Sequence, residues 1–186
     1  MKFSIIIPVR SINEFLKESI SELKKLQYSD FEVLIITDSP ETYSFEDTRF
    51  ILLDSGPLSP GEKRNIGAKK ANGDVLVFLD DDAFPGSNWL LEASIILENP
   101  EIYALGGPAV TPLDASFAER MSGRILESWL ASGGTVYRHV PSKERQIKDY
   151  PTVNLFVRKE AFWKVGGFSK DYWPGEDTKL CLDLVK

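Results

Sequence analysis

The stretch that decides the fold is Val75-Leu76-Val77-Phe78-Leu79-Asp80-Asp81-Asp82, in which five apolar residues lead directly into three acids. A short apolar run without polar alternation is typical of a strand buried on both faces, as strands of parallel sheets are. Open parallel sheets bind ligands at the carboxyl ends of their strands. The sequence therefore predicts a strand over residues 74–79 that carries three carboxylates at the ligand-binding edge of a sheet.

Strand and helix patterns alternate on both sides of this stretch, which indicates an α/β fold. Ser59 and Glu62 form a capping box with Pro60 at the first helical position, so the helix before the acidic strand is predicted to start there and to stop at Gly73. A second capping box, Ser11 with Glu14, is predicted to start the first helix. The expected strands are 3–9, 31–37, 50–53, 102–110 and 152–157, and the expected helices are 12–26, 60–72, 86–97, 115–130, 159–165 and 176–186.

Length and composition favour one folded domain over residues 1–186. The 186 residues are 42% hydrophobic and 27% charged, with a net charge of −6. An acidic chain without a basic stripe repels phosphate backbones, so nucleic acid is excluded as a partner. Cys181 is the sole cysteine, and no apolar run reaches the length of a membrane span. A cytoplasmic protein is expected.

The three consecutive carboxylates repel one another unless a cation or hydrogen-bond donors compensate them. Oxygen-rich clusters suit Mg²⁺ or Mn²⁺, which take further ligands from phosphates and water. Asp80, Asp81 and Asp82 therefore indicate a divalent metal that bridges a diphosphate. The alternative is a solvated acidic turn or a helix cap.

Other candidate ligand-binding residues lie near the same edge of the sheet. Lys63, Arg64 and Asn65 occupy the first turns of a helix, whose N-terminus attracts anions, so they could hold a phosphate or a base. Asp38 ends the second predicted strand and could accept hydrogen bonds from a nucleobase. Taken singly, the basic residues are more typical of a surface, and Asp38 is equally typical of a turn cap.

Glu176 and Asp177 stand at the start of the last predicted helix, where the helix dipole favours an ionised carboxylate. A general base at neutral pH needs an ionised group. The alternative is that both are ordinary acids of a first helical turn.

Six motifs in order resemble the family 2 glycosyltransferases, and together they span nearly the whole chain. The motifs are Ile7-Pro8-Val9-Arg10, Asp38-Ser39, Lys63-Arg64-Asn65-Ile66-Gly67, Phe78-Leu79-Asp80-Asp81-Asp82, Gly166-Gly167-Phe168 and Gly175-Glu176-Asp177. The resemblance implies a Rossmann-like GT-A fold, a three-layer α/β/α sandwich with a mostly parallel central sheet. Because family members often continue past the last motif, it also implies a catalytic domain truncated at its C-terminus.

The resemblance assigns roles to residues in three groups. Asp177 matches the general base, and Asp82 matches the metal-ligating acid of the DxD motif, with Asp80 as its partner. The donor nucleotide would be bound by Pro8, Arg10, Asp38, Lys63, Arg64, Asn65, Asp80 and Asp81. The acceptor would lie near Gly167, Phe168, Trp173 and Glu176.

The implied activity is inverting, metal-dependent transfer of a sugar from a nucleoside diphosphate sugar to a hydroxyl group. The resemblance favours a UDP-sugar, Mn²⁺ or Mg²⁺, and a saccharide or lipid-linked acceptor of cell-envelope polysaccharide synthesis, with peripheral membrane association through segments outside this chain. One rival is an inactive nucleotide-sugar or carbohydrate-binding descendant, which would have no use for Asp177. The other is a sugar nucleotidyltransferase, but residues 8–13 contain no glycine where that class carries a Gly-rich phosphate loop.

Overall fold

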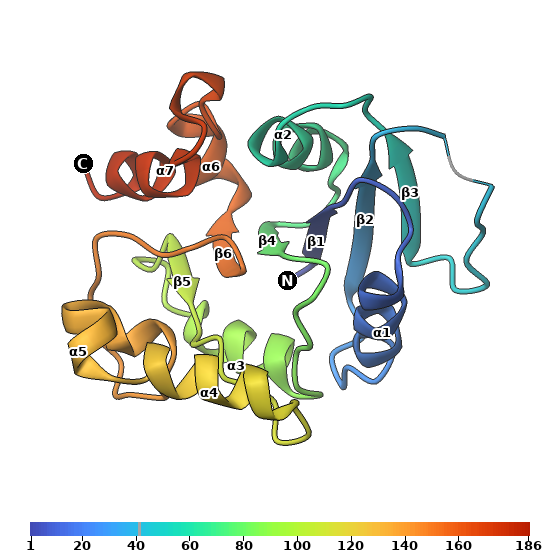
Figure 1. Cartoon of the computed structure of the whole chain (residues 1–186). Coiled ribbons are helices and arrows are strands. Elements are labelled where there is room, and N and C mark those ends of the chain that lie inside the picture. The colour runs from blue at the N-terminus through green and yellow to red at the C-terminus, as the bar shows by residue number, and fades with distance from the viewer. Residues whose placement is uncertain (41) are drawn as a thin grey trace.

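The computed structural model describes residues 1–40 and 42–186, which contain a six-stranded sheet of order β3-β2-β1-β4-β6-β5 (Figure 1). Strands β1 to β4 pair in parallel, and β6 is the one strand of this sheet that runs in the opposite direction, antiparallel to both of its neighbours, β4 and β5. The strands are β1 (Phe3–Pro8), β2 (Phe31–Thr37), β3 (Phe50–Asp54), β4 (Val75–Leu79), β5 (Ala104–Gly106) and β6 (Asn154–Arg158). The predicted α/β fold with a mostly parallel sheet is confirmed.

Helices cover both faces of the sheet, and the alternation of side chains along each strand divides the core in two. Ile5 and Ile7 of β1 face a cluster with α1 and α3, whereas Ile6 faces a cluster with α2, α6 and α7. Figure 1 shows these two helical layers on opposite sides of the sheet. The helices are α1 (Glu14–Leu23), α2 (Pro60–Lys70), α3 (Trp89–Ile96), α4 (Phe117–Leu126), α5 (Trp129–Ser132), α6 (Lys159–Lys164) and α7 (Glu176–Leu184), with 3₁₀ turns η1 (Gly133–Arg138) and η2 (Lys170–Tyr172).

The predicted capping box is correct for α2 and wrong for α1. In α2 the Glu62 amide donates to Ser59 Oγ, and the Ser59 amide donates to the Glu62 carboxylate. In α1 the cap is Asn13, whose side-chain oxygen accepts from the Leu16 amide at 2.8 Å. Glu14 is the first helical residue, so it stands too early in the helix to be the third residue of a box begun at Ser11.

The prediction that Gly73 stops α2 is wrong, because the helix ends earlier, at Lys70. A Cβ at Gly73 would lie 2.7 Å from the Lys2 carbonyl oxygen. The glycine therefore allows the chain to pass close to β1 before it enters β4.

The region between β5 and β6 departs most from the predictions. The expected strand 102–110 is only three residues long, and the expected helix 115–130 breaks into α4 and α5. Its apolar stripe, which the periodicity predicts to be buried, is exposed in the described structure: Phe117 by 72% and Trp129 by 74%. None of the helices in the described ranges is long and apolar enough to cross a membrane.

Gly67 marks the close contact between α2 and the sheet. A Cβ at this position would lie 2.6 Å from Ile6 Cγ2 and 3.0 Å from Ile36 Cδ1. We expect Gly67→Ala to lower the free energy of unfolding by about 1–2 kcal/mol, because overpacking outweighs the roughly 1 kcal/mol gain in helix propensity. Urea denaturation measures this. The control is Gly86→Ala, whose added Cβ would meet no atom closer than 3.7 Å; an equal loss in both variants would contradict the packing argument.

Candidate active site

The carboxyl ends of β1, β2 and β4 meet at one edge of the sheet, because these strands are parallel neighbours. This edge brings Pro8, Asp38 and Asp80 together from three distant parts of the sequence. The Asp38 amide donates to the Arg10 carbonyl at 3.0 Å, which ties the loops after β1 and β2 to each other. The predicted donor-side residues thus share one edge, with the side chain of Arg10 exposed.

Lys63 is buried beneath this edge, with only 4% of its side chain exposed. Its ammonium group pairs with Asp38 and donates to the Val9 carbonyl at 2.6 Å. Two residues that were each predicted to bind a donor are therefore partners of each other, and the ion pair holds the loops after β1 and β2 against α2.

Arg64, one residue further along α2, bridges two carboxylates from distant segments. Its Nη2 lies 2.8 Å from Asp80 Oδ1 and its Nη1 lies 3.4 Å from Glu176 Oε1. The Arg64 side chain is 6% exposed, and its guanidinium lies 5.8 Å from the centre of the Phe168 ring. A buried charge that is paired in this way fixes the relative position of the groups around it.

The three acids after β4 have different environments. Asp80 is paired with Arg64, Asp81 accepts a hydrogen bond of 2.6 Å from Asn13, and Asp82 is exposed. Within residues 1–40 and 42–186, the Asp82 carboxylate has no hydrogen bond or ion pair. Burial raises the pKa of Asp80, and the negative charges of Asp82 and Asp81 raise it further, whereas Arg64 opposes the rise.

The carboxylates of Asp80 and Asp82 fit a divalent cation, although they do not form a complete set of metal ligands by themselves. In the part of the chain that the structure describes, no three His, Cys, Asp or Glu side chains form a metal-binding group. Mg²⁺ is commonly held by one or two carboxylates, with phosphate and water as its other ligands. Asp82, which is open to solvent, and Asp80, whose charge is disfavoured by burial, provide oxygen donors of that kind at a strand end.

Asn13 is the residue of this site that the sequence predictions missed. It caps α1 through its oxygen and binds Asp81 through its nitrogen. An asparagine just before an apolar helical pattern is a typical helix cap, so the sequence could have identified this role. The contact with Asp81 could not be predicted, because only the fold shows that α1 begins next to the acids.

The first turn of α7 contains the other acidic pair. Glu176 is 5% exposed and accepts hydrogen bonds from Arg64 and from the Gly175 amide. Asp177 is half-buried, and one of its oxygens accepts from the Thr178 amide at 2.8 Å. Trp173, just before this turn, is 55% exposed. Its ring is therefore accessible for stacking on a ligand.

Two of the predicted acceptor-side residues are placed by Asn65 on α2. The Asn65 amide nitrogen donates to the Phe168 carbonyl at 2.7 Å, and its oxygen accepts from the Phe168 amide at 2.9 Å. Gly167 has a φ of +73°, which favours glycine, and a Cβ there would lie 2.7 Å from Asn65 Oδ1. The Phe168 ring packs in the core against Phe78.

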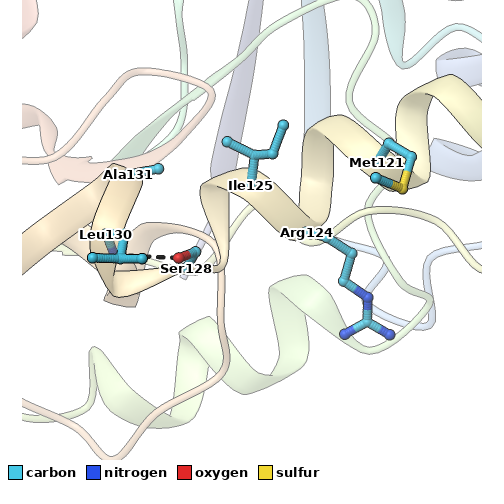
Figure 2. Close-up of a pocket in the computed structure, with 6 residues that line it drawn as sticks. All are labelled: Met121, Arg124, Ile125, Ser128, Leu130 and Ala131. Atoms are coloured by element: carbon cyan, nitrogen blue, oxygen red, sulfur yellow. Dashed lines mark hydrogen bonds between the residues drawn. The ribbon is translucent and has the colours of Figure 1, made fainter.

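A separate hollow lies over α4 and α5, outside the cluster of acids. Figure 2 shows its lining residues, which are Met121, Arg124, Ile125, Ser128, Leu130 and Ala131. None of the predicted site residues lines it. The chemistry of the carboxyl edge is therefore not located in this hollow.

Solved structures share the fold. The structure of TarS residues 1–349 from S. aureus has a TM-score of 0.67 and 17% sequence identity, covering 99% of this chain and 55% of that one. The same TarS fragment was also solved with UDP-GlcNAc. Mannosyltransferase PcManGT from Pyrobaculum calidifontis, solved with GDP-Man and Mn²⁺, has a TM-score of 0.65 and 16% identity, covering 96% of this chain and 50% of that one. The fold is the GT-A fold.

The sequence profile described as glycosyl transferase family 2 matches residues 4–166. The chain belongs to this family. Glycosyltransferase AglE from Haloferax volcanii is 26% identical over 194 residues, which cover 97% of this chain and 61% of AglE. The chain therefore spans about three fifths of this relative. The profile match ends before Gly167, so it includes the acids after β4 and does not include α7.

Proposed function

We propose that the chain is the catalytic domain of an inverting glycosyltransferase that uses a nucleoside diphosphate sugar. The observation that carries the proposal is the connection of its two acidic groups through one buried arginine: Arg64 contacts Asp80 after β4 and Glu176 at the start of α7. A site for sugar transfer needs residues that bind the donor and a catalytic base. Asp80 belongs to the proposed donor-binding residues, and Glu176 is the neighbour of the proposed base, Asp177. The family membership and the GT-A fold support the same activity.

In this proposal Asp177 is the catalytic base. Its carboxylate lies in the first turn of α7, where the helix dipole stabilises negative charge. It would accept the proton of the acceptor hydroxyl as that oxygen attacks the anomeric carbon. Because one base and one displacement are involved, the configuration at that carbon inverts.

The donor-side residues hold and neutralise the leaving nucleoside diphosphate. Arg64 keeps positive charge beside Asp80 after β4, and Asp38, after β2 at the same edge of the sheet, would meet the nucleobase. Asp82 and Asp80 would hold Mn²⁺ or Mg²⁺, which when bound offsets negative charge on the diphosphate. The complexes of PcManGT with GDP-Man and Mn²⁺ and of TarS with UDP-GlcNAc support this class of donor.

We propose a UDP-sugar as donor and a saccharide or lipid-linked hydroxyl acceptor, with the exposed Trp173 beside the base available to stack on a sugar ring. A role in cell-envelope polysaccharide synthesis agrees with the name of TarS, poly(ribitol-phosphate) beta-N-acetylglucosaminyltransferase. The rival proposal, a binding descendant without turnover, lacks a reason for Asp177. A sugar nucleotidyltransferase remains disfavoured, because the loop after β1 contains no glycine.

Calorimetric titration of UDP, GDP, CDP and dTDP tests the donor side of this proposal. With Mn²⁺ present we expect one nucleotide to bind at least about tenfold more tightly than with EDTA, a difference of about 1.4 kcal/mol. The physical reason is that the acids at the strand edge repel a diphosphate unless a cation intervenes. Affinities that are equal with Mn²⁺ and EDTA would contradict metal dependence, and no binding of any nucleotide would contradict the donor site.

A further inference from the structure

The contact between Glu176 and Arg64 joins two parts of the chain that are 112 residues apart. Both side chains are buried, with 7% and 6% of their surfaces exposed. Arg64 also contacts Asp80, so a continuous row of a carboxylate, a guanidinium and a second carboxylate runs from the end of β4 to the first turn of α7. Arg64 is therefore the one side chain of this row that links the first turn of α7 to the end of β4.

The backbone around this row is adapted to close approach. A Cβ at Gly61 would lie 3.0 Å from Glu176 Cγ and 3.4 Å from Phe168 Cβ, so a glycine in the first turn of α2 lets the start of α7 pack directly on it. The two Asn65 hydrogen bonds hold the Phe168 backbone to α2 one turn away. The helix that contacts the acidic edge is thus also the support of α7.

We propose that Glu176 is a positioning residue: through Arg64 it fixes the first turn of α7, and with it Asp177, relative to the acidic end of β4. Glu176 is buried, and its carboxylate accepts hydrogen bonds from Arg64 and from the Gly175 amide, so its effect on Asp177 is transmitted through these partners. This inference rests on the proposed function only in giving Asp177 the role of base. The physical coupling between Glu176, Arg64 and Asp80 exists without it.

The test compares Glu176→Gln with Asp183→Asn, which removes a carboxylate from the other end of α7, where it pairs with Lys179 and Lys186. For Glu176→Gln we expect affinity for the nucleotide with Mn²⁺ to stay within about threefold, and release of nucleoside diphosphate from its sugar conjugate to fall at least about thirtyfold. Asp183→Asn should change neither quantity. A lower melting temperature with unchanged turnover of the folded protein would overturn the proposal, because that result means a purely structural role.

A second pair of variants perturbs Glu176 without removing any charge. Gly61→Ala pushes on Glu176 Cγ, whereas Gly134→Ala adds a Cβ with no atom within 4 Å. We expect Gly61→Ala to lower turnover by about three- to tenfold with nucleotide affinity retained, and Gly134→Ala to leave both unchanged. Equal turnover in the two alanine variants would count against the proposal.

Amide hydrogen exchange of α7 tests the positioning role of Glu176 independently of the proposed function. We expect amide exchange at residues 179 and 180, which close the first turn of α7, to be at least about tenfold faster in Glu176→Gln than in wild type or Asp183→Asn, and exchange in β4 to be unchanged. If wild type releases no nucleotide from any sugar nucleotide, the proposed function fails, and the exchange result still decides whether Glu176 positions α7. Unchanged exchange at residues 179 and 180 would overturn the positioning role.

Discussion

Asp177→Asn is expected to lower the rate of sugar transfer by about 10²–10⁴-fold, which is the usual contribution of a general base. Asparagine has nearly the same shape but cannot take the proton of the acceptor hydroxyl. It can still accept the hydrogen bond from the Thr178 amide, so the first turn of α7 should keep its structure. The measurement is the initial rate of nucleoside diphosphate release in the presence of acceptor.

Nucleotide affinity is the companion measurement for this variant, because Asp177 belongs to a different segment from the donor-side acids. We expect calorimetry with Mn²⁺ to give the same affinity for wild type and Asp177→Asn within about threefold. Asp114→Asn, a change on an exposed loop residue, is the control for rate and affinity. A tenfold or greater loss of nucleotide affinity in Asp177→Asn would contradict the separation of base from donor site.

Asp82→Ala is expected to weaken Mn²⁺-dependent nucleotide binding by at least about tenfold. Its carboxylate is exposed and lacks a hydrogen bond or ion pair within the described residues, so its removal leaves no buried partner unpaired and stability should be unchanged. Calorimetry measures the affinity and thermal melting measures the stability.

The internal control for Asp82→Ala is the same titration in EDTA. Without a cation, wild type and variant should bind nucleotide equally weakly, or the variant slightly better because one repelling charge is gone. If the two proteins bind equally in Mn²⁺, Asp82 is not a metal ligand, and the assignment passes to Asp80 and Asp81.

The sheet could be predicted because its strands leave strong local signals. The apolar run Val75–Leu79 is buried on both faces, as is typical of a central strand in a sheet that helices cover on both sides. The start of α2 could also be predicted, since Ser59, Pro60 and Glu62 satisfy the first helical amides from within one turn. Local interactions of this kind are present in the sequence itself.

The partners within the site could not be predicted, because each links distant segments. Asn13 and Asp81 are 68 residues apart, and nothing in the spacing of either motif indicates that they meet. The role predicted for Glu176 near the acceptor stays a prediction, and its burial against Arg64 depends on how α7 packs on α2. Sequence patterns identified candidate site residues, whereas the packing of the helices decides which of these residues contact each other.

The exposed stripe of α4 shows the limit of periodicity. Phe117, Met121 and Ile125 recur at every fourth residue, which correctly predicts an amphipathic helix. Periodicity gives the face that is apolar, but burial also requires another element against that face, and no local signal provides it. In the described structure these side chains are exposed.

Proton NMR of the reaction started with an α-linked nucleotide sugar tests directly whether the chain transfers a sugar with inversion, with the donor chosen by the calorimetric titrations. We expect the β-anomer of the transferred sugar to appear as the first product, together with an equal amount of nucleoside diphosphate, and Asp177→Asn to form neither at a comparable rate. An α-linked first product would contradict the single displacement assigned to Asp177, and the absence of any sugar transfer or nucleotide release would contradict the proposed function.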